Sequence, residues 1–119
     1  MKRNITEIVK HYLICALWCS IVDDGELLDA NYDLSDITPE LYLKSTKDVE
    51  QFVELAGDML DDWSDEQIGH DFWLTRNGHG AGFWDRDLPF RYELTNLVQY
   101  GTKFTPINIF VNDFNQIDC

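Results

Sequence analysis

Between Gly69 and Arg86 the chain reads GHDFWLTRNGHGAGFWDR, which brings together four aromatic residues, two His, two Asp, two Arg and four of the seven glycines. Two stretches, 71–76 (DFWLTR) and 81–86 (AGFWDR), are rich in residues that favour strands. Between them, 77–80 (NGHG) supply residues that tolerate the positive φ angles of a tight reversal. The segment therefore predicts a β-hairpin at about 70–86.

The pairing of side chains across this hairpin depends on the length of its loop. If 77–80 form the loop, Trp73 faces Trp84 and Asp71 faces Arg86, which joins two aromatics and two opposite charges. A two-residue turn gives a register with less favourable pairs, so we prefer the first. Both faces of the hairpin are apolar. One should cover the core, and the face with Trp73 and Trp84 should be covered by another element or presented to a partner.

The rest of the chain predicts one α+β domain spanning residues 1–119. A length of 119 residues with 45% hydrophobic content is enough for one core. We expect three to four helices packed on one face of a small three- to four-stranded antiparallel sheet. Before the hairpin we expect a helix from Asn4 or Thr6 to Val22, a long acidic loop over 23–38, a short helix Pro39–Leu43 and a helix from Ser45 to about Trp63. After the hairpin we expect a helix from about Phe90 to Tyr100 stopped by Gly101, then a strand Ile107–Asn112, a turn at 113–115 and a last short strand.

The first 22 residues begin with a basic tip and continue with an apolar run. Polar residues interrupt this run at helical intervals, no small-x-small cleavage site follows, and Asp23 and Asp24 end it too early for a membrane span. We therefore predict a cytoplasmic protein with no membrane contact. Ile14 and Trp18 widen the apolar face of this helix, so its second half should be buried on more than one side.

The signature HDFWLTRNGHGAGFWDR (70–86), together with ALW...DDGELLDANYDLSDITPE (16–40), resembles a family of small acidic proteins encoded by bacteriophages and prophages. The similarity covers most of the chain and implies a protein made inside an infected bacterium. Family members mostly carry no assigned activity, so it implies a setting more firmly than a mechanism. The chain departs from the family near its end, where Asn112-Asp113-Phe114-Asn115 replaces an acidic, glycine-containing turn.

The net charge of −13 is concentrated in the middle third of the chain. Residues 22–67 hold 15 acidic and two basic side chains, whereas the remainder is neutral. Such a field opposes binding to nucleic-acid phosphates and suits a basic partner. The candidate partner-binding carboxylates lie along and just beyond one predicted helix, with a spacing that would imitate a row of phosphates on a rigid rod: Glu50, Glu54, Asp58, Asp61, Asp62 and Asp65. The simpler interpretation is a solvated helix face that confers solubility.

A neighbouring anchor patch is expected on the hairpin, since Trp and Arg are the residue types that most often carry interface energy. Its members are Trp73, Arg76, His79, Trp84 and Arg86. Together the two surfaces predict a non-enzymatic, phage-encoded protein that binds and inhibits a host defence or nucleic-acid-processing protein, with no cofactor. The alternatives are a small metal-dependent enzyme centred on the hairpin and an accessory protein that binds a basic protein of phage replication.

Three site patterns are weaker. The first has the spacing of a calcium-binding loop and consists of Asp29, Asn31, Asp33, Ser35 and Glu40. Because Leu34 stands where such a loop needs Gly, we prefer the interpretation that these side chains cap their own turns. The second consists of residues of the types that bind metals: His70, Asp71, His79 and Asp85. The predicted hairpin would separate the two His by roughly 20 Å, too far to share one ion. The glycines at 78, 80 and 82 precede a predicted strand, whereas a phosphate-binding loop needs a helix there. We therefore predict no metal, nucleotide or catalytic residue.

Overall fold

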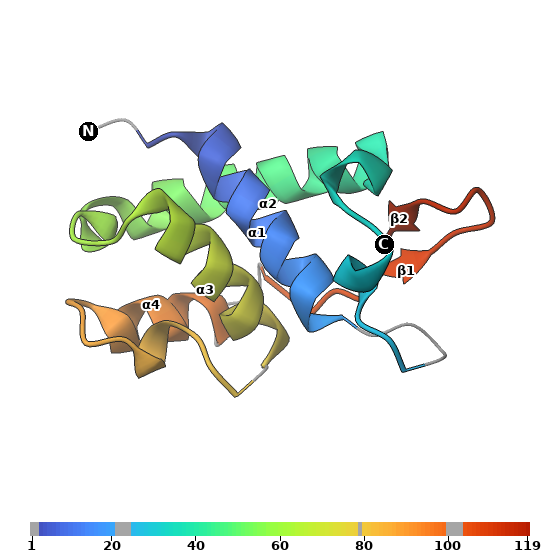
Figure 1. Ribbon diagram of the computed structural model, residues 1–119. Coiled ribbons are helices and arrows are strands. Elements are labelled where there is room, and N and C mark those ends of the chain that lie inside the picture. Colours follow the sequence, from blue (N-terminus) through green and yellow to red (C-terminus); the bar gives the residue numbers. More distant parts are fainter. Residues whose placement is uncertain (1–2, 21–24, 79, 100–103) are drawn as a thin grey trace.

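Helix α1 lies in the middle of the molecule, with α2, α3 and the short elements of the acidic loop packed around it (Figure 1). The computed structural model describes residues 3–20, 25–78, 80–99 and 104–119. Its elements, in order, are α1 (Ile5–Cys19), the 3-10 turns η1 (Leu28–Ala30) and η2 (Leu34–Asp36), α2 (Pro39–Ala56), η3 (Gly57–Leu60), α3 (Asp65–Asn77), η4 (Phe83–Asp85), α4 (Arg91–Gln99), β1 (Phe110–Val111) and β2 (Ile117–Asp118).

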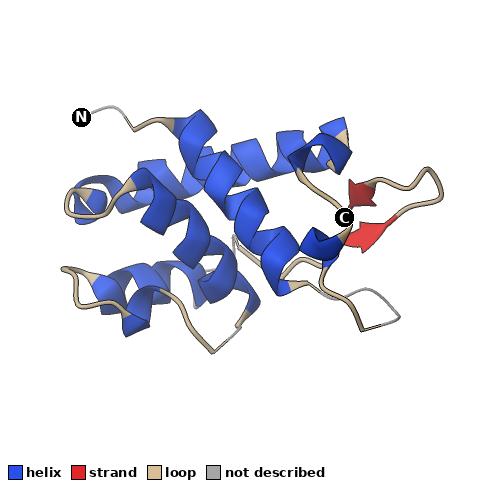
Figure 2. Cartoon of the chain, in the orientation of Figure 1, coloured by secondary structure: helices blue, strands red, loops and turns tan. Residues whose placement is uncertain are grey.

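The architecture is broadly α+β, as predicted, but it is mostly helical and has fewer strands than expected. Within the described residues, four α-helices accompany a single two-stranded antiparallel sheet (Figure 2). In this sheet Phe110 pairs with Asp118 and Val111 pairs with Ile117. The sheet lies at one end of the molecule, and the Ile117 carbonyl accepts the Thr38 N–H at 2.9 Å, which ties the C-terminal strand to the start of α2.

The predicted hairpin at 70–86 was wrong. Its first half is the C-terminal part of α3, which begins after Ser64, whose hydroxyl accepts the Gln67 N–H. Gly78 ends the helix in the left-handed conformation (φ 65°), and its N–H points back to the carbonyls of Leu74 and Thr75. Asn77 and Gly78, the first two residues of the predicted hairpin turn, are therefore the end and the cap of a helix. The strand preference of the aromatics was misleading because α3 is buried around most of its circumference, where packing outweighs local propensity.

Three other boundaries differ from the prediction. Helix α2 is continuous from Pro39, capped by Thr38, so Ser45 lies buried inside the helix and caps nothing. The predicted strand Ile107–Asn112 is reduced to Phe110–Val111. The predicted helix at 90–100 is α4, Arg91–Gln99, whereas its proposed stop at Gly101 lies outside the described residues.

Helix α1 follows the prediction at its start but not on its outer face. It begins after Asn4, whose side chain accepts the Glu7 N–H, and buries seven of its residues. Ile14 and Trp18, which we expected to be buried, are 41% and 53% exposed. None of the helices in the described part of the chain is long and apolar enough to cross a membrane.

The backbone of α3 comes very close to the backbone of α1 at Gly69. A Cβ atom there would lie 2.3 Å from the Ile8 carbonyl oxygen and 2.8 Å from the Tyr12 nitrogen, both backbone atoms of α1. This contact lets the aromatic side chains of α3 reach the core, where Phe72 stacks on Phe52 with ring centroids 4.5 Å apart. Gly69 therefore sets the distance between the two central helices.

We expect Gly69→Ala to lower the free energy of unfolding by about 3 kcal/mol, because the added methyl group must push two helix backbones apart. Gly78→Ala is the matched control: apart from its neighbours in the chain, no atom of the described residues lies within 4 Å of its Cβ position, so only the positive φ costs energy, about 1 kcal/mol. Urea unfolding of both variants measures the difference. Equal losses would show that the helix contact tolerates a side chain.

Candidate functional site

The candidate carboxylates gather around the turn that joins α2 to α3. Glu50 and Glu54 lie on α2, Asp58 lies in η3, and Asp61, Asp62 and Asp65 follow. We call these six residues the acidic corner. All are exposed except Asp65, which is half-buried and paired with Arg3 at 3.3 Å. The turn lies at the opposite end of the molecule from the two-stranded sheet (Figure 1).

The acidic corner is not the rigid rod that the sequence predicted. Helix α2 ends at Ala56, and Gly57 (φ 53°, ψ −128°) redirects the chain into η3 before α3 begins at Asp65. The carboxylates therefore follow a bend, because three segments of different direction carry them. Their predicted role in binding a partner stays a prediction.

The exposed members of the acidic corner carry uncompensated charge. Among the described residues, no Lys or Arg forms an ion pair with Glu50, Glu54, Asp58, Asp61 or Asp62. Nearby Asp48 differs, since it contacts both Arg76 at 2.7 Å and Lys44 at 3.4 Å. The corner thus projects its negative potential into solvent.

Two members of the predicted anchor patch lie in the core. Trp73 is 2% exposed and Arg76 is 4% exposed. The Arg76 guanidinium donates to the Asp48 carboxylate at 2.7 Å, the Tyr12 hydroxyl at 3.1 Å and the Thr105 carbonyl at 2.8 Å. The prediction that Trp73 and Arg76 are surface anchors was wrong, because α3 buries both side chains: Trp73 packs edge-on against Tyr12 of α1, and Arg76 reaches both α1 and α2.

The remaining anchor residues are not a continuous exposed surface. Trp84 and Arg86 are half-buried, and His79 lies outside the described residues. The Arg86 guanidinium donates bidentate hydrogen bonds to the carboxylate of the fully buried Asp71, the shortest at 2.7 Å. The Gln67 side chain donates to the same carboxylate. The predicted Asp71–Arg86 ion pair exists, but it joins α3 to the residue after η4 and is not a cross-strand pair.

Asp33 and Asp71, which belong to two of the other predicted site patterns, have structural roles. Asp33 caps η2 and accepts both the backbone N–H and the hydroxyl of Ser35, which lowers the pKa of Asp33. Asp71 is held by Arg86, and no group of three or more His, Cys, Asp or Glu side chains is placed to hold a metal within the described ranges.

The two thiols of α1 are close together but poorly suited to nucleophilic chemistry. The Sγ atoms of Cys15 and Cys19 lie 3.7 Å apart. Burial raises the pKa of both thiols, so both are protonated at neutral pH. They behave as small apolar side chains, which agrees with their place in a helix of the core.

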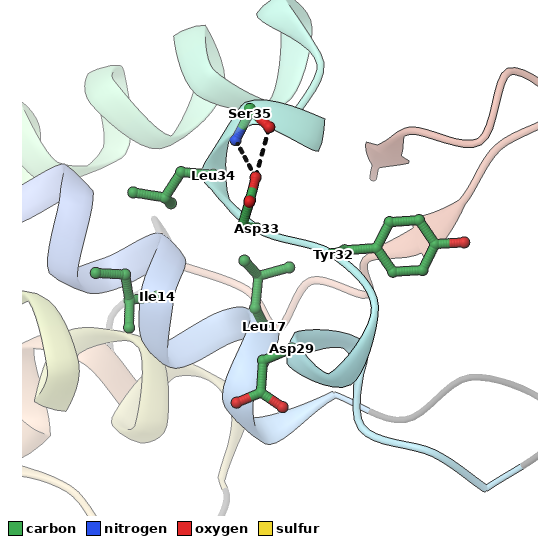
Figure 3. A pocket seen from close by; sticks show the side chains of 7 residues that line it. All are labelled: Ile14, Leu17, Asp29, Tyr32, Asp33, Leu34 and Ser35. Carbon is green, nitrogen blue, oxygen red and sulfur yellow. Dashed lines mark hydrogen bonds between the residues drawn. The ribbon is translucent and has the colours of Figure 1, made fainter.

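The structure also shows a surface hollow that the sequence reasoning missed. Its volume is about 420 Å³ and it lies between α1 and the η1–η2 segment (Figure 3). Its lining residues are Ile14, Leu17, Asp29, Tyr32, Asp33, Leu34 and Ser35. The signal in the sequence was the surplus of apolar residues on α1, which we had assigned to deeper burial.

The comparisons with known proteins add no family or fold assignment. No family model, curated protein or solved structure matches the chain. The resemblance to small acidic phage proteins therefore stays a prediction.

Removing the partner of the buried Asp71 should destabilise the fold. We expect Arg86→Ala to lower the free energy of unfolding by about 3 kcal/mol, because the Asp71 carboxylate would keep only Gln67 as a partner. Lys10→Ala is the control, since Lys10 is exposed on α1 and makes a longer ion pair with Glu7, at 3.8 Å, and its loss should cost below about 1 kcal/mol. Thermal or urea unfolding measures both. Similar losses would mean that Asp71 is not held by Arg86.

Tyr12 makes stability depend on pH at the alkaline end. Burial raises the pKa of Tyr12 from 10.0 to about 12. The unfolded chain therefore loses the Tyr12 proton first, and the native protein loses stability as pH rises from 10 to 12. At pH 8 the free energy of unfolding of Tyr12→Phe should be about 1 kcal/mol below that of the wild type, because Arg76 loses a hydrogen bond. This difference between the variant and the wild type should become smaller above pH 10. Urea unfolding at several pH values tests it, and a constant gap would refute the assignment.

Proposed function

We propose that this protein is a non-catalytic binding protein that uses its acidic corner to occupy the nucleic-acid-binding surface of a basic protein. The observation that supports this is the set of exposed carboxylates that lack an ion pair with any Lys or Arg of the described residues. A partner with a basic groove would supply the missing counter-charges. Complementary potentials raise the association rate and favour partners of the right sign.

The charge density of the corner suggests partial mimicry of DNA. Consecutive carboxylates on α2, such as Glu50 and Glu54, are separated by four residues, or about 6 Å along the helix axis. Each strand of duplex DNA carries one charge per about 3.4 Å. The corner therefore offers roughly half the linear charge of one strand, so we expect association that is steered by charge and weakened by salt, with further contacts supplying the rest of the affinity.

The biological role that fits this surface is inhibition. A protein that covers a nucleic-acid groove blocks the enzyme or complex that needs it. The resemblance to small acidic phage proteins supports a site of action in the cytoplasm of an infected bacterium, with a host defence or nucleic-acid-processing protein as the target. A basic protein of phage replication is the alternative partner, because the same surface would bind it.

The test compares two variants with the same change in net charge. The first reverses four carboxylates of the corner, Glu50, Glu54, Asp58 and Asp61, to Lys. The matched control reverses four exposed carboxylates outside the corner, Asp85, Asp87, Glu93 and Asp113, to Lys. Each form is used for affinity purification from bacteria with and without phage infection, and the captured proteins are identified by mass spectrometry.

We expect the corner variant to lose a basic nucleic-acid-binding protein that the wild type and the control retain. The wild type should also displace labelled duplex DNA from that protein. This displacement should be weaker at about 300 mM than at about 50 mM salt, because screening weakens charge pairing. Unchanged capture by the corner variant would refute the proposal. Capture of a phage replication protein would replace inhibition with the accessory role.

A further inference from the structure

The hollow beside α1 has apolar walls that the chain itself does not fill. Figure 3 shows Leu34 of η2 above Ile14 of α1, with Leu17 beside them. Ile14 is 41% exposed, and Leu34 is half-buried. The Tyr32 ring points away from these residues, and its hydroxyl donates to the Asn115 side chain at 2.7 Å. The apolar surface of the hollow is therefore left to solvent.

The mouth of the hollow is acidic. Two of its seven lining residues are Asp and none is Lys, Arg or His. Ser35 orients one carboxylate, that of Asp33, through two hydrogen bonds, and these lower the pKa of Asp33. The other, Asp29, is exposed and has no hydrogen bond or ion pair with any described residue. Apolar walls next to the Asp29 carboxylate suit a peptide segment in which a large apolar side chain is followed or preceded by a positively charged one.

The apolar surface continues along α1 beyond the hollow. Trp18 lies one turn after Ile14, is 53% exposed and packs on the His70 ring with centroids 5.8 Å apart. Trp18 does not line the hollow, but an exposed Trp one turn along the same helix is the kind of side chain that contributes most to protein interfaces. A volume of about 420 Å³ accommodates one large side chain together with part of its neighbour.

We propose that this hollow receives a large apolar side chain flanked by Lys or Arg from a partner protein. The inference rests on the proposed function only in taking the partner to be basic. It concerns a different surface, because η1 and η2 lie near the end of the molecule that carries the sheet, whereas the acidic corner lies at the other end (Figure 1). The apolar side chain would contact Ile14, Leu17 and Leu34, and the basic residue would pair with Asp29.

The probe is a set of three capped tripeptides, with sequences Lys-Phe-Lys, Glu-Phe-Glu and Lys-Ala-Lys. Each is titrated to about 10 mM into the full-length, ¹⁵N-labelled chain, and amide shifts are followed by NMR. We expect Lys-Phe-Lys to shift the amides of 14–18 and 29–35 in a saturable manner. The other two should leave these amides at least about tenfold less affected, because one lacks the positive charge and the other lacks the apolar tip.

Matched variants assign the binding to the hollow. Ile14→Lys and Asp29→Lys should each weaken Lys-Phe-Lys binding at least about tenfold. Leu43→Lys, at a 55% exposed apolar position on α2, and Asp113→Lys, at an exposed acid near the C-terminus, should leave it unchanged. The variant with Lys at four positions of the acidic corner should also bind Lys-Phe-Lys normally, which separates this inference from the proposed function.

Several results would overturn the proposal. One is the absence of saturable shifts at 14–18 and 29–35 with Lys-Phe-Lys. Another is an equal response to Glu-Phe-Glu or Lys-Ala-Lys, which would remove the charge or the apolar requirement. A third is shifts confined to the acidic corner, which would leave the proposed function standing and refute the role of the hollow.

Discussion

The buried guanidinium of Arg76 is the interaction on which the assembly of this fold depends. It contacts Tyr12 of α1, Asp48 of α2 and the Thr105 carbonyl of the segment after α4, and its own residue belongs to α3. It also lies over the Phe72 and Phe104 rings. A buried cation is costly without partners, so these contacts must form together. Arg76 thereby couples three helices and the C-terminal segment to one arrangement.

The sequence predicted the elements whose boundaries are set by local chemistry. Asn4 and the apolar spacing after it marked α1, and the last turn and short strand followed from the polar run at 112–115. The hairpin failed because aromatic content predicts burial without predicting which secondary structure is buried. Asn77-Gly78 is equally suited to a hairpin turn and to a helix end, and only the Ser64 cap thirteen residues upstream favoured the helix.

Of the candidate site, too, one part could be predicted from the sequence and two parts could not. The acidic corner could be found from sequence because a run of carboxylates with few cations stays exposed in almost any fold. The anchor patch could not, since the exposure of Trp73 and Arg76 depends entirely on whether their segment is a strand or a helix. The hollow beside α1 was also out of reach, because it is formed by α1 and the η1–η2 segment together.

The exposed charge of the corner follows from how the core uses its cations. Arg76 and Lys44 are paired with Asp48, Arg86 with Asp71, and Arg3 with Asp65. These contacts hold helices and loops together, so the same cations are unavailable to the carboxylates between Glu50 and Asp62. Six of the seven Lys and Arg side chains in the described part of the chain make an ion pair with an acidic side chain of the same chain, so little positive charge is left to neutralise this surface. A partner that supplies cations to the carboxylates between Glu50 and Asp62 therefore competes with no ion pair of the described residues, so charge-driven binding there breaks none of these internal contacts.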